Sequence, residues 1–339
     1  MTEPLKNHCA TLRSDIFTQG LLAEWLDIKG PQISLKLPFA AKTEAERLIK
    51  SDPLLQGYRW DVQVAVESMA HSKGAGQPIA ARNVIAVASG KGGVGKSSVC
   101  VNLALALSRA GAKVGILDAD VYGPSLPTML GNRDAKLTFT PNRKMLPLQR
   151  YGLQVNSLGY LVDAEDATVW RGPMASGALE QLYNDTQWQD LDYLLIDMPP
   201  GTGDIQLTLA QKLPLTGAVV VTTPQTVALA DAQKGIAMFR KVDVPLLGII
   251  ENMSYFQCGE CGHQDPVFGQ QGGADVARKH SVPLLGQWPL LTELRQSMDD
   301  GTPLVYDKPN HSYSDLIMQS AQQMAGNLYE FLGPEPAQE

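Results

Sequence analysis

Short apolar runs recur along the chain from position 83 onward, and helical segments separate them. The runs are apolar throughout, as expected of parallel strands that helices cover on both faces. They are NVIAVAS (83–89), AKVGILD (112–118), LDYLLID (191–197), TGAVVVTT (216–223), PLLGIIE (245–251) and VPLLGQW (282–288). Helices are expected at 174–185, 204–212, 227–240 and 273–280. This alternation predicts an α/β fold with a doubly wound, mainly parallel sheet.

A longer amphipathic segment, SYSDLIMQSAQQMAGNLYEFLG at 312–333, predicts a final helix. No Lys or Arg follows Lys308, so this helix lacks the basic face of a membrane anchor. The apolar residues at helical spacing should therefore form a buried face. They are Ile317, Ala321, Met324, Leu328 and Phe331.

The first 70 residues have a different pattern. PQISLKL (31–37) and RWDVQVAV (59–66) alternate polar and apolar positions around the helical TEAERLIKS (43–51). We predict a small α/β accessory domain at 1–70 and a linker at 71–82, where HSKGAGQPIAAR is small, polar and rich in Gly. The larger α/β domain would then span 83–332, and 333–339 would be a tail.

The composition argues against a nucleic-acid-binding, membrane-spanning or disulfide-rich protein. The 339 residues are 44% hydrophobic and carry a formal net charge of −7, with Lys and Arg thinly spread, which argues against a nucleic-acid-binding surface. No apolar run approaches the ~18 residues of a membrane span, and the first ten residues lack a signal peptide's basic-then-apolar order. Four scattered cysteines do not form a disulfide framework. We expect a cytoplasmic protein without nucleic-acid or membrane partners.

The segment GKGGVGKSS (90–98) fits the phosphate-loop pattern G-x-x-x-x-G-K-[S/T] and lies between a predicted strand and a predicted helix. Glycines let backbone N–H groups surround phosphate, Lys96 places a cation at the β- and γ-phosphates, and Ser97 offers a hydroxyl to Mg²⁺. A glycine-rich turn with a chance lysine is the competing interpretation, which the strand–helix context disfavours. The predicted ATP-binding residues are Gly90, Lys91, Gly92, Gly93, Val94, Gly95, Lys96, Ser97 and Ser98.

Lys91 is a second lysine in this loop, and holding phosphate within one chain does not require it. It is either a solvated surface lysine or a cation that crosses a dimer interface to the other subunit's nucleotide, and we favour the second. Asp118 and Asp120 follow one predicted strand and Asp197 ends another. We predict that Asp120 acts in catalysis with Lys91 and Lys96 by orienting the attacking water, and that Asp197 and Ser97 bind Mg²⁺.

ATP is the expected nucleotide. The guanine-reading N-K-x-D pattern is absent, because the nearest string, RKVD at 240–243, begins with Arg. Asn252 follows the strand at 245–251 and is placed where an amide could contact the base.

Cys258 and Cys261 in YFQCGECGHQ form the only Cys-x-x-Cys pair, which is half of a tetrahedral site. A twofold dimer could supply the other half, so that four thiolates hold one [4Fe–4S] cluster. The pair could also belong to a zinc site with His263, or be a redox pair, although GECGHQDP opens a helix poorly. Cys100 is expected to be buried as a small hydrophobic residue, and Cys9 to be an incidental surface thiol.

Taken together, these segments resemble the Mrp-type iron–sulfur cluster carrier ATPases. This branch of the deviant Walker A class is related to nitrogenase iron protein and to the division- and partition-site ATPases. The resemblance covers roughly residues 83 to 310. It is carried by SGKGGVGKSS, LDADVYGPSLPTMLG, WRGPMASGALEQL, LDYLLIDMPPGTGD, ENMSYFQCGECGH and FGQQGGADVA.

The resemblance implies a homodimer with weak ATPase activity. Its cofactors would be ATP, Mg²⁺ and a [4Fe–4S] cluster, which Cys258 and Cys261 of both subunits bind, accept from an upstream donor and pass to apo iron–sulfur proteins. Asp120 would be the switch-I aspartate and Asp197 the Walker-B aspartate. Residues 1–70 resemble the small domain that often precedes this ATPase, but KLPFAAK lacks its usual cysteine, which leaves docking or dimer support. The alternatives are a dimeric positioning ATPase with structural zinc and a nucleotide-dependent electron-transfer protein.

Overall fold

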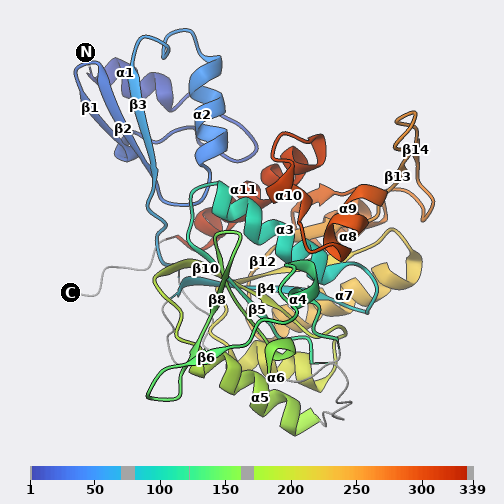
Figure 1. Ribbon diagram of the computed structural model, residues 1–339. Helices are drawn as coiled ribbons and strands as arrows, with labels where there is room; N and C mark the ends of the chain where they lie inside the picture. The colour runs from blue at the N-terminus through green and yellow to red at the C-terminus, as the bar shows by residue number, and fades with distance from the viewer. Residues whose placement is uncertain (1, 70–80, 122, 162–171, 334–339) are drawn as a thin grey trace.

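The computed structural model describes residues 2–69, 81–121, 123–161 and 172–333 (Figure 1). Its larger sheet has the strand order β15-β12-β11-β4-β10-β5-β9-β8, parallel except for β8, which runs antiparallel to β9. The strands are β4 (Ala81–Ser89), β5 (Val114–Asp118), β8 (Leu148–Arg150), β9 (Leu153–Ser157), β10 (Leu191–Asp197), β11 (Gly217–Thr222), β12 (Leu246–Glu251) and β15 (Leu284–Gln287). The predicted doubly wound, mainly parallel α/β fold is confirmed.

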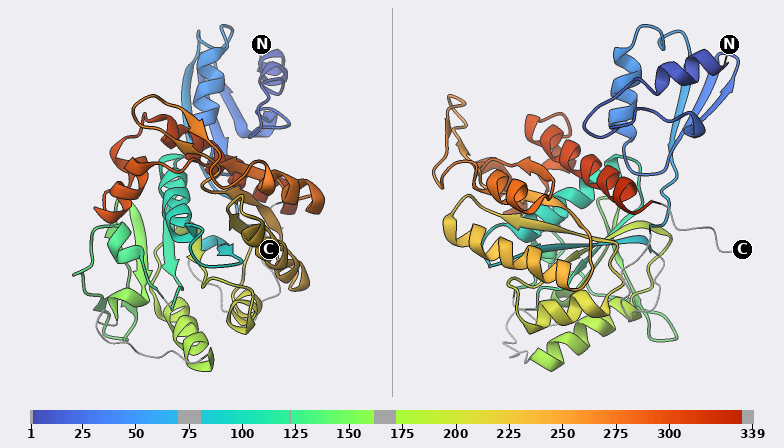
Figure 2. Two further views of the ribbon diagram at one scale, coloured as in Figure 1. Left: turned by 90° about the vertical axis from the view of Figure 1, so that its right-hand side faces the viewer. Right: turned by 180° about the vertical axis from the view of Figure 1, so that it is seen from behind.

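Helices cover both faces of this sheet, which explains why its central strands are apolar throughout (Figure 2). On one face lie α3 (Lys96–Arg109) and α11 (Ser312–Leu332), which pack against each other. On the other lie α5 (Gly172–Asp185), α6 (Asp204–Lys212) and α7 (Thr226–Lys241). The helices expected at 174–185, 204–212, 227–240, 273–280 and 312–333 are each present within two residues of the expected bounds.

Shorter elements complete the larger part of the chain. They are α4 (Leu126–Met129), α8 (Gly272–His280), α9 (Thr292–Asp299), α10 (Leu304–Asp307), η2 (Leu158–Tyr160) and the hairpins β6 (Thr138–Phe139) with β7 (Met145–Leu146) and β13 (Phe256–Gln257) with β14 (Gln264–Asp265). The β13–β14 hairpin projects from the opposite side of the molecule to the N-terminal sheet (Figure 1).

The N-terminal sheet has the order β1-β2-β3, with β1 antiparallel and β3 parallel to β2. Its elements are α1 (Thr2–Cys9), η1 (Ala23–Trp25), β1 (Leu26–Lys29), β2 (Gln32–Leu37), α2 (Lys42–Ser51) and β3 (Arg59–Val64). The domain boundaries stay a prediction. Of the linker predicted at 71–82, Ala81 and Arg82 begin β4 and the rest lies outside the described residues, as does the tail from 334 onward.

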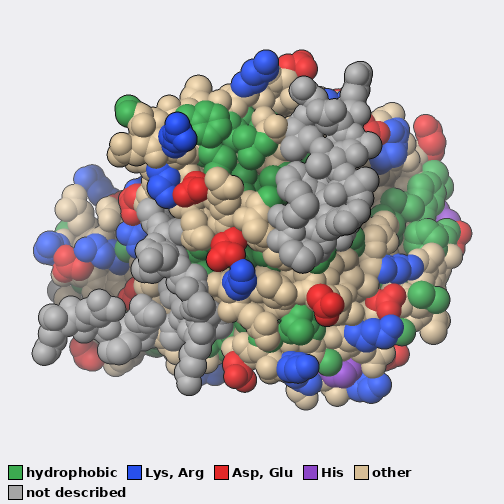
Figure 3. All heavy atoms as spheres, turned by 90° about the horizontal axis from the view of Figure 1, so that it is seen from below, with side chains coloured by type: hydrophobic (Ala, Val, Ile, Leu, Met, Phe, Trp, Pro, Cys, Tyr) green, Lys and Arg blue, Asp and Glu red, His purple; other side chains and the backbone are tan. Residues whose placement is uncertain are grey.

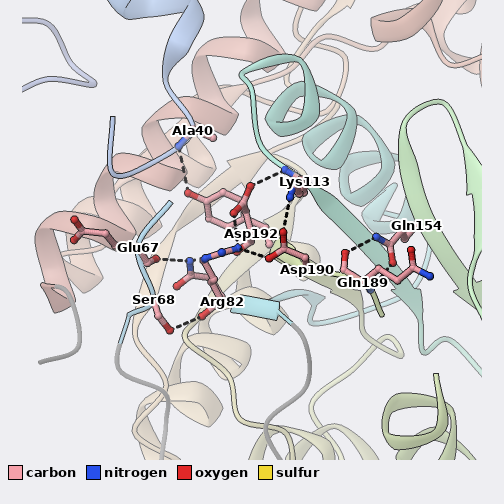
Figure 4. A network of polar contacts seen from close by, with 11 residues as sticks. Ala40, Glu67, Ser68, Arg82, Lys113, Gln154, Gln189, Asp190 and Asp192 are labelled. Atoms are coloured by element: carbon pink, nitrogen blue, oxygen red, sulfur yellow. Dashed lines mark hydrogen bonds and ion pairs between the residues drawn. The ribbon is translucent and has the colours of Figure 1, made fainter. Parts of the chain in front are cut away.

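A network of polar contacts joins the N-terminal sheet to the amino ends of β4 and β10 (Figure 4). The Asn83 side chain donates to the Glu67 carbonyl at 2.9 Å and accepts from the Met69 N–H at 3.1 Å. The Tyr193 hydroxyl accepts from the Ala40 N–H at 3.3 Å. The contacts with Met69 and Ala40 are buried, so losing either would leave an unpaired polar group.

Two predictions of burial were wrong. Cys9 is a buried thiol, not a surface one, and burial raises its pKa to about 11. Phe331 is 49% exposed, although the rest of the predicted α11 face is buried. The last turn of α11 instead packs through Tyr329, whose ring lies 5.4 Å from that of Phe39 and 6.1 Å from that of Trp25.

Candidate nucleotide site and cysteine hairpin

The predicted phosphate loop turns from β4 into α3 and needs glycine for two separate reasons. Gly93 and Gly95 have φ of 82° and 81°, in the left-handed region that other residues rarely adopt. Gly90 packs against α7 so closely that a Cβ atom would lie 2.2 Å from the Asp231 carbonyl carbon. The loop therefore exposes backbone N–H groups at the start of α3, as phosphate binding requires.

Lys96 is the cation of this loop, and its side chain is only 5% exposed. Its ammonium contacts the Asp197 carboxylate, lies 3.6 Å from Asp120 and is 3.3 Å from the Ser97 hydroxyl. Burial lowers the pKa of Lys96, but the charges of Asp197 and Asp120 outweigh burial and the net shift is upward. The side chain thus stays protonated and joins three of the predicted site residues.

The strand-terminal acids converge because β5 and β10 are paired with Asp118 opposite Asp197. Asp118 is fully buried and accepts hydrogen bonds from the Ser157 hydroxyl at 2.9 Å, the Asp120 N–H at 3.1 Å and the Leu126 N–H at 3.3 Å. Burial, together with the nearby Asp197 charge, raises the pKa of Asp118 to about 7. Ser157 was not predicted from the sequence, since it ends β9, a strand next to the edge of the sheet that the apolar pattern did not predict.

Asp197 has the chemistry that a magnesium ligand needs. It is fully buried, and burial raises its pKa in spite of the Lys96 charge. Its Oδ2 atom is buried and has no hydrogen-bond partner within the described ranges. A buried carboxylate oxygen without a donor costs free energy, and a hard divalent cation would satisfy it. Asp197 and the neighbouring Ser97 hydroxyl therefore fit Mg²⁺.

Asn252 and Lys91 also lie at the phosphate loop, and their roles in binding nucleotide stay predictions. Asn252, which follows β12, donates its side-chain amide to the Val94 carbonyl at 2.9 Å. It therefore braces the loop, and its contact with a base stays a prediction. Lys91 accepts from the Ser89 hydroxyl through its carbonyl at 2.8 Å, and its ammonium pairs with no acid in the described segments.

Cys258 and Cys261 occupy the turn of the β13–β14 hairpin. The Cys258 N–H donates to the His263 carbonyl and the Gly262 N–H to the Cys258 carbonyl, both at 2.9 Å, while Gly262 has a φ of 71°. Cys258 is half-buried and Cys261 exposed. The backbone N–H groups of Cys261 and Glu260 lower the pKa of the Cys258 thiol. This turn favours the thiolate form that binds metal.

The hairpin does not complete a metal site within one chain. Across the described residues, no three His, Cys, Asp or Glu side chains group as metal ligands. A zinc site built from this pair and His263 alone is therefore not assembled among the described residues.

The surface carries side chains of both charges. On the face in Figure 3, Lys and Arg side chains are interspersed with Asp and Glu. In the ranges that the structure covers, no helix has the length and apolarity to cross a membrane.

Comparisons with known proteins place these features in a family. The family described as NUBPL iron-transfer P-loop NTPase, of the ParA group, matches residues 80–325. The iron–sulfur cluster carrier protein of Haemophilus influenzae is 51% identical over 305 residues, covering 88% of this chain and 82% of its own. The protein of the same name from Escherichia coli K12 is 58% identical over 248 residues, covering 73% and 67%. A nucleotide-binding protein from Archaeoglobus fulgidus, solved with ADP, is 36% identical with a TM-score of 0.61, covering 70% and 92%.

Proposed function

The chain belongs to the NUBPL-type iron-transfer P-loop NTPases of the ParA group, and from that premise we propose that it is an ATP-hydrolysing iron–sulfur cluster carrier. It would act as a homodimer that binds one [4Fe–4S] cluster, accepts it from an upstream donor and passes it to apo iron–sulfur proteins. All four cysteines are free thiols, which suits the reducing cytoplasm as its place of action.

The observation that carries this proposal is the exposed hairpin of Cys258 and Cys261. It offers two thiols, one with a lowered pKa, and the described part of the chain supplies no third ligand beside them. In a twofold dimer each residue faces its symmetry mate, so two hairpins together provide the four thiolates that a [4Fe–4S] cluster needs. A cluster held at an exposed turn would also be accessible to a recipient protein.

The nucleotide site would perform hydrolysis through residues that already converge. Lys96 and the loop N–H groups hold the β- and γ-phosphates, and Asp197 with Ser97 would hold Mg²⁺. When bound, Mg²⁺ neutralises charge on the phosphate oxygens. Asp120 orients a water molecule and accepts its proton as the water oxygen bonds to the γ-phosphorus. The bond from that phosphorus to the β–γ bridging oxygen then breaks, which yields ADP and phosphate.

Lys91 would act across the dimer. Its ammonium has no acid partner within the described ranges, so it is available to another subunit's nucleotide. Placed beside the γ-phosphate of the opposite site, a lysine stabilises the charge that develops during transfer, as an arginine finger does. Hydrolysis would then require the same dimer that completes the cluster site.

The test is iron and acid-labile sulfide content after anaerobic reconstitution, compared between the wild type and a Cys258→Ser, Cys261→Ser double variant. We expect about two iron and two sulfide per chain in the wild type, and loss of both in the variant. A Cys100→Ser variant is the matched control, because that thiol is fully buried in α3 and should not contribute.

The competing functions give different results. Zinc at about half an equivalent per chain without sulfide would contradict the carrier and favour a zinc-stapled positioning ATPase. A cluster that stays bound through repeated redox cycles and is not passed to an apo-protein would favour an electron-transfer protein.

A further inference from the structure

Glu251 is a buried carboxylate that the proposed chemistry does not use. It ends β12, is 0% exposed and forms no ion pair with any residue in the described segments. Instead its Oε1 accepts from the Ser254 hydroxyl at 2.7 Å and the Gln287 amide at 2.8 Å, and its Oε2 accepts from the Gly273 N–H. A buried charge is costly unless hydrogen bonds surround it, so this one fixes its three donors in place.

Those donors come from separate parts of the fold. Gln287 is the last residue of β15, and Gly273 lies in the first turn of α8, where the helix dipole also favours an anion. Gly273 fits only because it lacks a side chain, since a Cβ would lie 2.7 Å from Glu251 Oε2. Glu251 thus ties β12, β15 and α8 together at one point.

The third donor belongs to the turn that touches the phosphate loop. Asn252 donates to the Val94 carbonyl at 2.9 Å, and Met253 adopts a left-handed φ of 55° that a non-glycine residue seldom takes. Ser254 closes the turn by donating to both the carbonyl and the carboxylate of Glu251. The carboxylate therefore holds a strained turn against the loop that binds nucleotide.

The same turn leads directly to the cysteines. Cys258 follows Asn252 by six positions. The backbone between them forms hydrogen bonds with the backbone of residues 288–290. Ser254 N–H donates to the Trp288 carbonyl at 2.9 Å, the Leu290 N–H donates to the Tyr255 carbonyl at 2.7 Å, and the Gln257 N–H donates to the Leu290 carbonyl at 3.3 Å. The turn and the hairpin are thus joined by a segment whose backbone is hydrogen-bonded to a neighbouring segment.

We propose that Glu251 is a positioning residue that couples the phosphate loop to the cysteine hairpin, so that nucleotide binding changes the exposure of Cys258 and Cys261. The inference rests on the proposed function and names how that site is regulated. With the carboxylate in place, the Asn252 turn moves only together with the ends of β15 and α8. A Gln side chain would set an N–H group against one of the three donors and loosen that link.

The test measures alkylation of the hairpin thiols by iodoacetamide in the metal-free full chain, with and without ATP and Mg²⁺. Cys9 and Cys100 are 0% exposed, so the modified thiols are those of the hairpin. In the wild type we expect the alkylation rates with and without ATP to differ by about fivefold or more. In Glu251→Gln the ratio of these two rates should approach one while ATP still binds. Ser254→Ala keeps the Glu251 carboxylate and should bring the ratio only part of the way to one. This variant replaces Glu251→Gln in the test if Glu251→Gln fails to fold.

The matched control is Asp192→Asn, the same chemical change in a buried acid near the start of β10 (Figure 4), whereas Glu251 ends β12. Asp192 accepts from the Lys113 N–H at 2.8 Å and pairs with Arg82 at 2.9 Å, and it should keep the wild-type ratio. A wild-type rate that ATP leaves unchanged, or a Glu251→Gln variant with the wild-type ratio, would overturn the coupling. Neither result bears on cluster content, so the carrier function is judged separately.

Discussion

Replacing Asp118 by Asn should remove the pH dependence of stability that this acid imposes. Asp118 has a pKa of about 7 in the folded chain, against 3.8 for an ordinary aspartate. Between those values the folded chain holds a proton that the unfolded chain has released, so stability falls as pH rises through this window. Above pH 7 the loss is complete. The difference of about three pKa units corresponds to at most about 4 kcal/mol.

The Asn side chain has the same shape but cannot ionise. It keeps one acceptor oxygen, and its amide would face either the Leu126 N–H or the Asp120 N–H, which leaves a buried donor unpaired at about 1–3 kcal/mol. Between pH 5 and pH 8 the wild type should lose about 3 kcal/mol of stability through this acid, and the variant should not. At pH 8 the variant should be more stable than the wild type, by about 1–3 kcal/mol.

Thermal unfolding midpoints at pH 5, 6, 7 and 8, without nucleotide and with EDTA, measure this effect. An Asp134→Asn variant is the control, because that exposed acid should leave the wild-type pH profile unchanged. If Asp118→Asn showed the wild-type slope between pH 5 and 8, Asp118 would already be ionised at pH 5 and the electrostatic reasoning would be wrong.

Further predictions concern the loop, the dimer, the hairpin and the N-terminal sheet. Gly90→Ala should lower the thermal midpoint far more than Gly92→Ala, since a Cβ meets backbone at the first position and open space at the second. Lys91→Ala should reduce ATP turnover at least about 100-fold while ATP affinity, measured by calorimetry, changes little. The lowered pKa of Cys258 should make its alkylation rate reach half its maximum at a lower pH than that of free cysteine, as mass spectrometry can follow. Asn83→Ala, which removes the contacts of this buried side chain with Glu67 and Met69, should destabilise the chain by about 1–3 kcal/mol in urea unfolding.

The central strands and the phosphate loop could be predicted because their signals are local. An apolar run covered on both faces and a glycine-lysine loop depend on neighbouring residues only, and both stand where the sequence places them. The strands β8 and β9, at one side of the sheet, have no such apolar run. β9 reads LQVNS, and its Asn156 is buried only because Thr186, 30 positions later, accepts from its amide at 2.6 Å.

Side-chain environment was also harder to predict than secondary structure. Cys9 looked like a surface thiol because α1 is short and polar, yet the chain folds back so that the Leu21 N–H donates to the Cys9 carbonyl. Phe331 continues the apolar spacing of α11, but the aromatic rings of Trp25 and Phe39 pack against Tyr329 instead. For α11 the partners that decide which ring packs come from a distant part of the chain.

Glu251 and Asp197 each end a buried strand, yet their carboxylates have different hydrogen-bond partners. The Glu251 carboxylate is surrounded by donors contributed 3, 22 and 36 positions away, so it needs no cation. Asp197 has Lys96 on one oxygen and no hydrogen-bond donor on the other within the described chain, so it can still accept a metal. Unequal satisfaction of two similar carboxylates therefore supports the positioning role proposed for Glu251 and the magnesium-binding role proposed for Asp197, and this difference depends on the folded arrangement of donors.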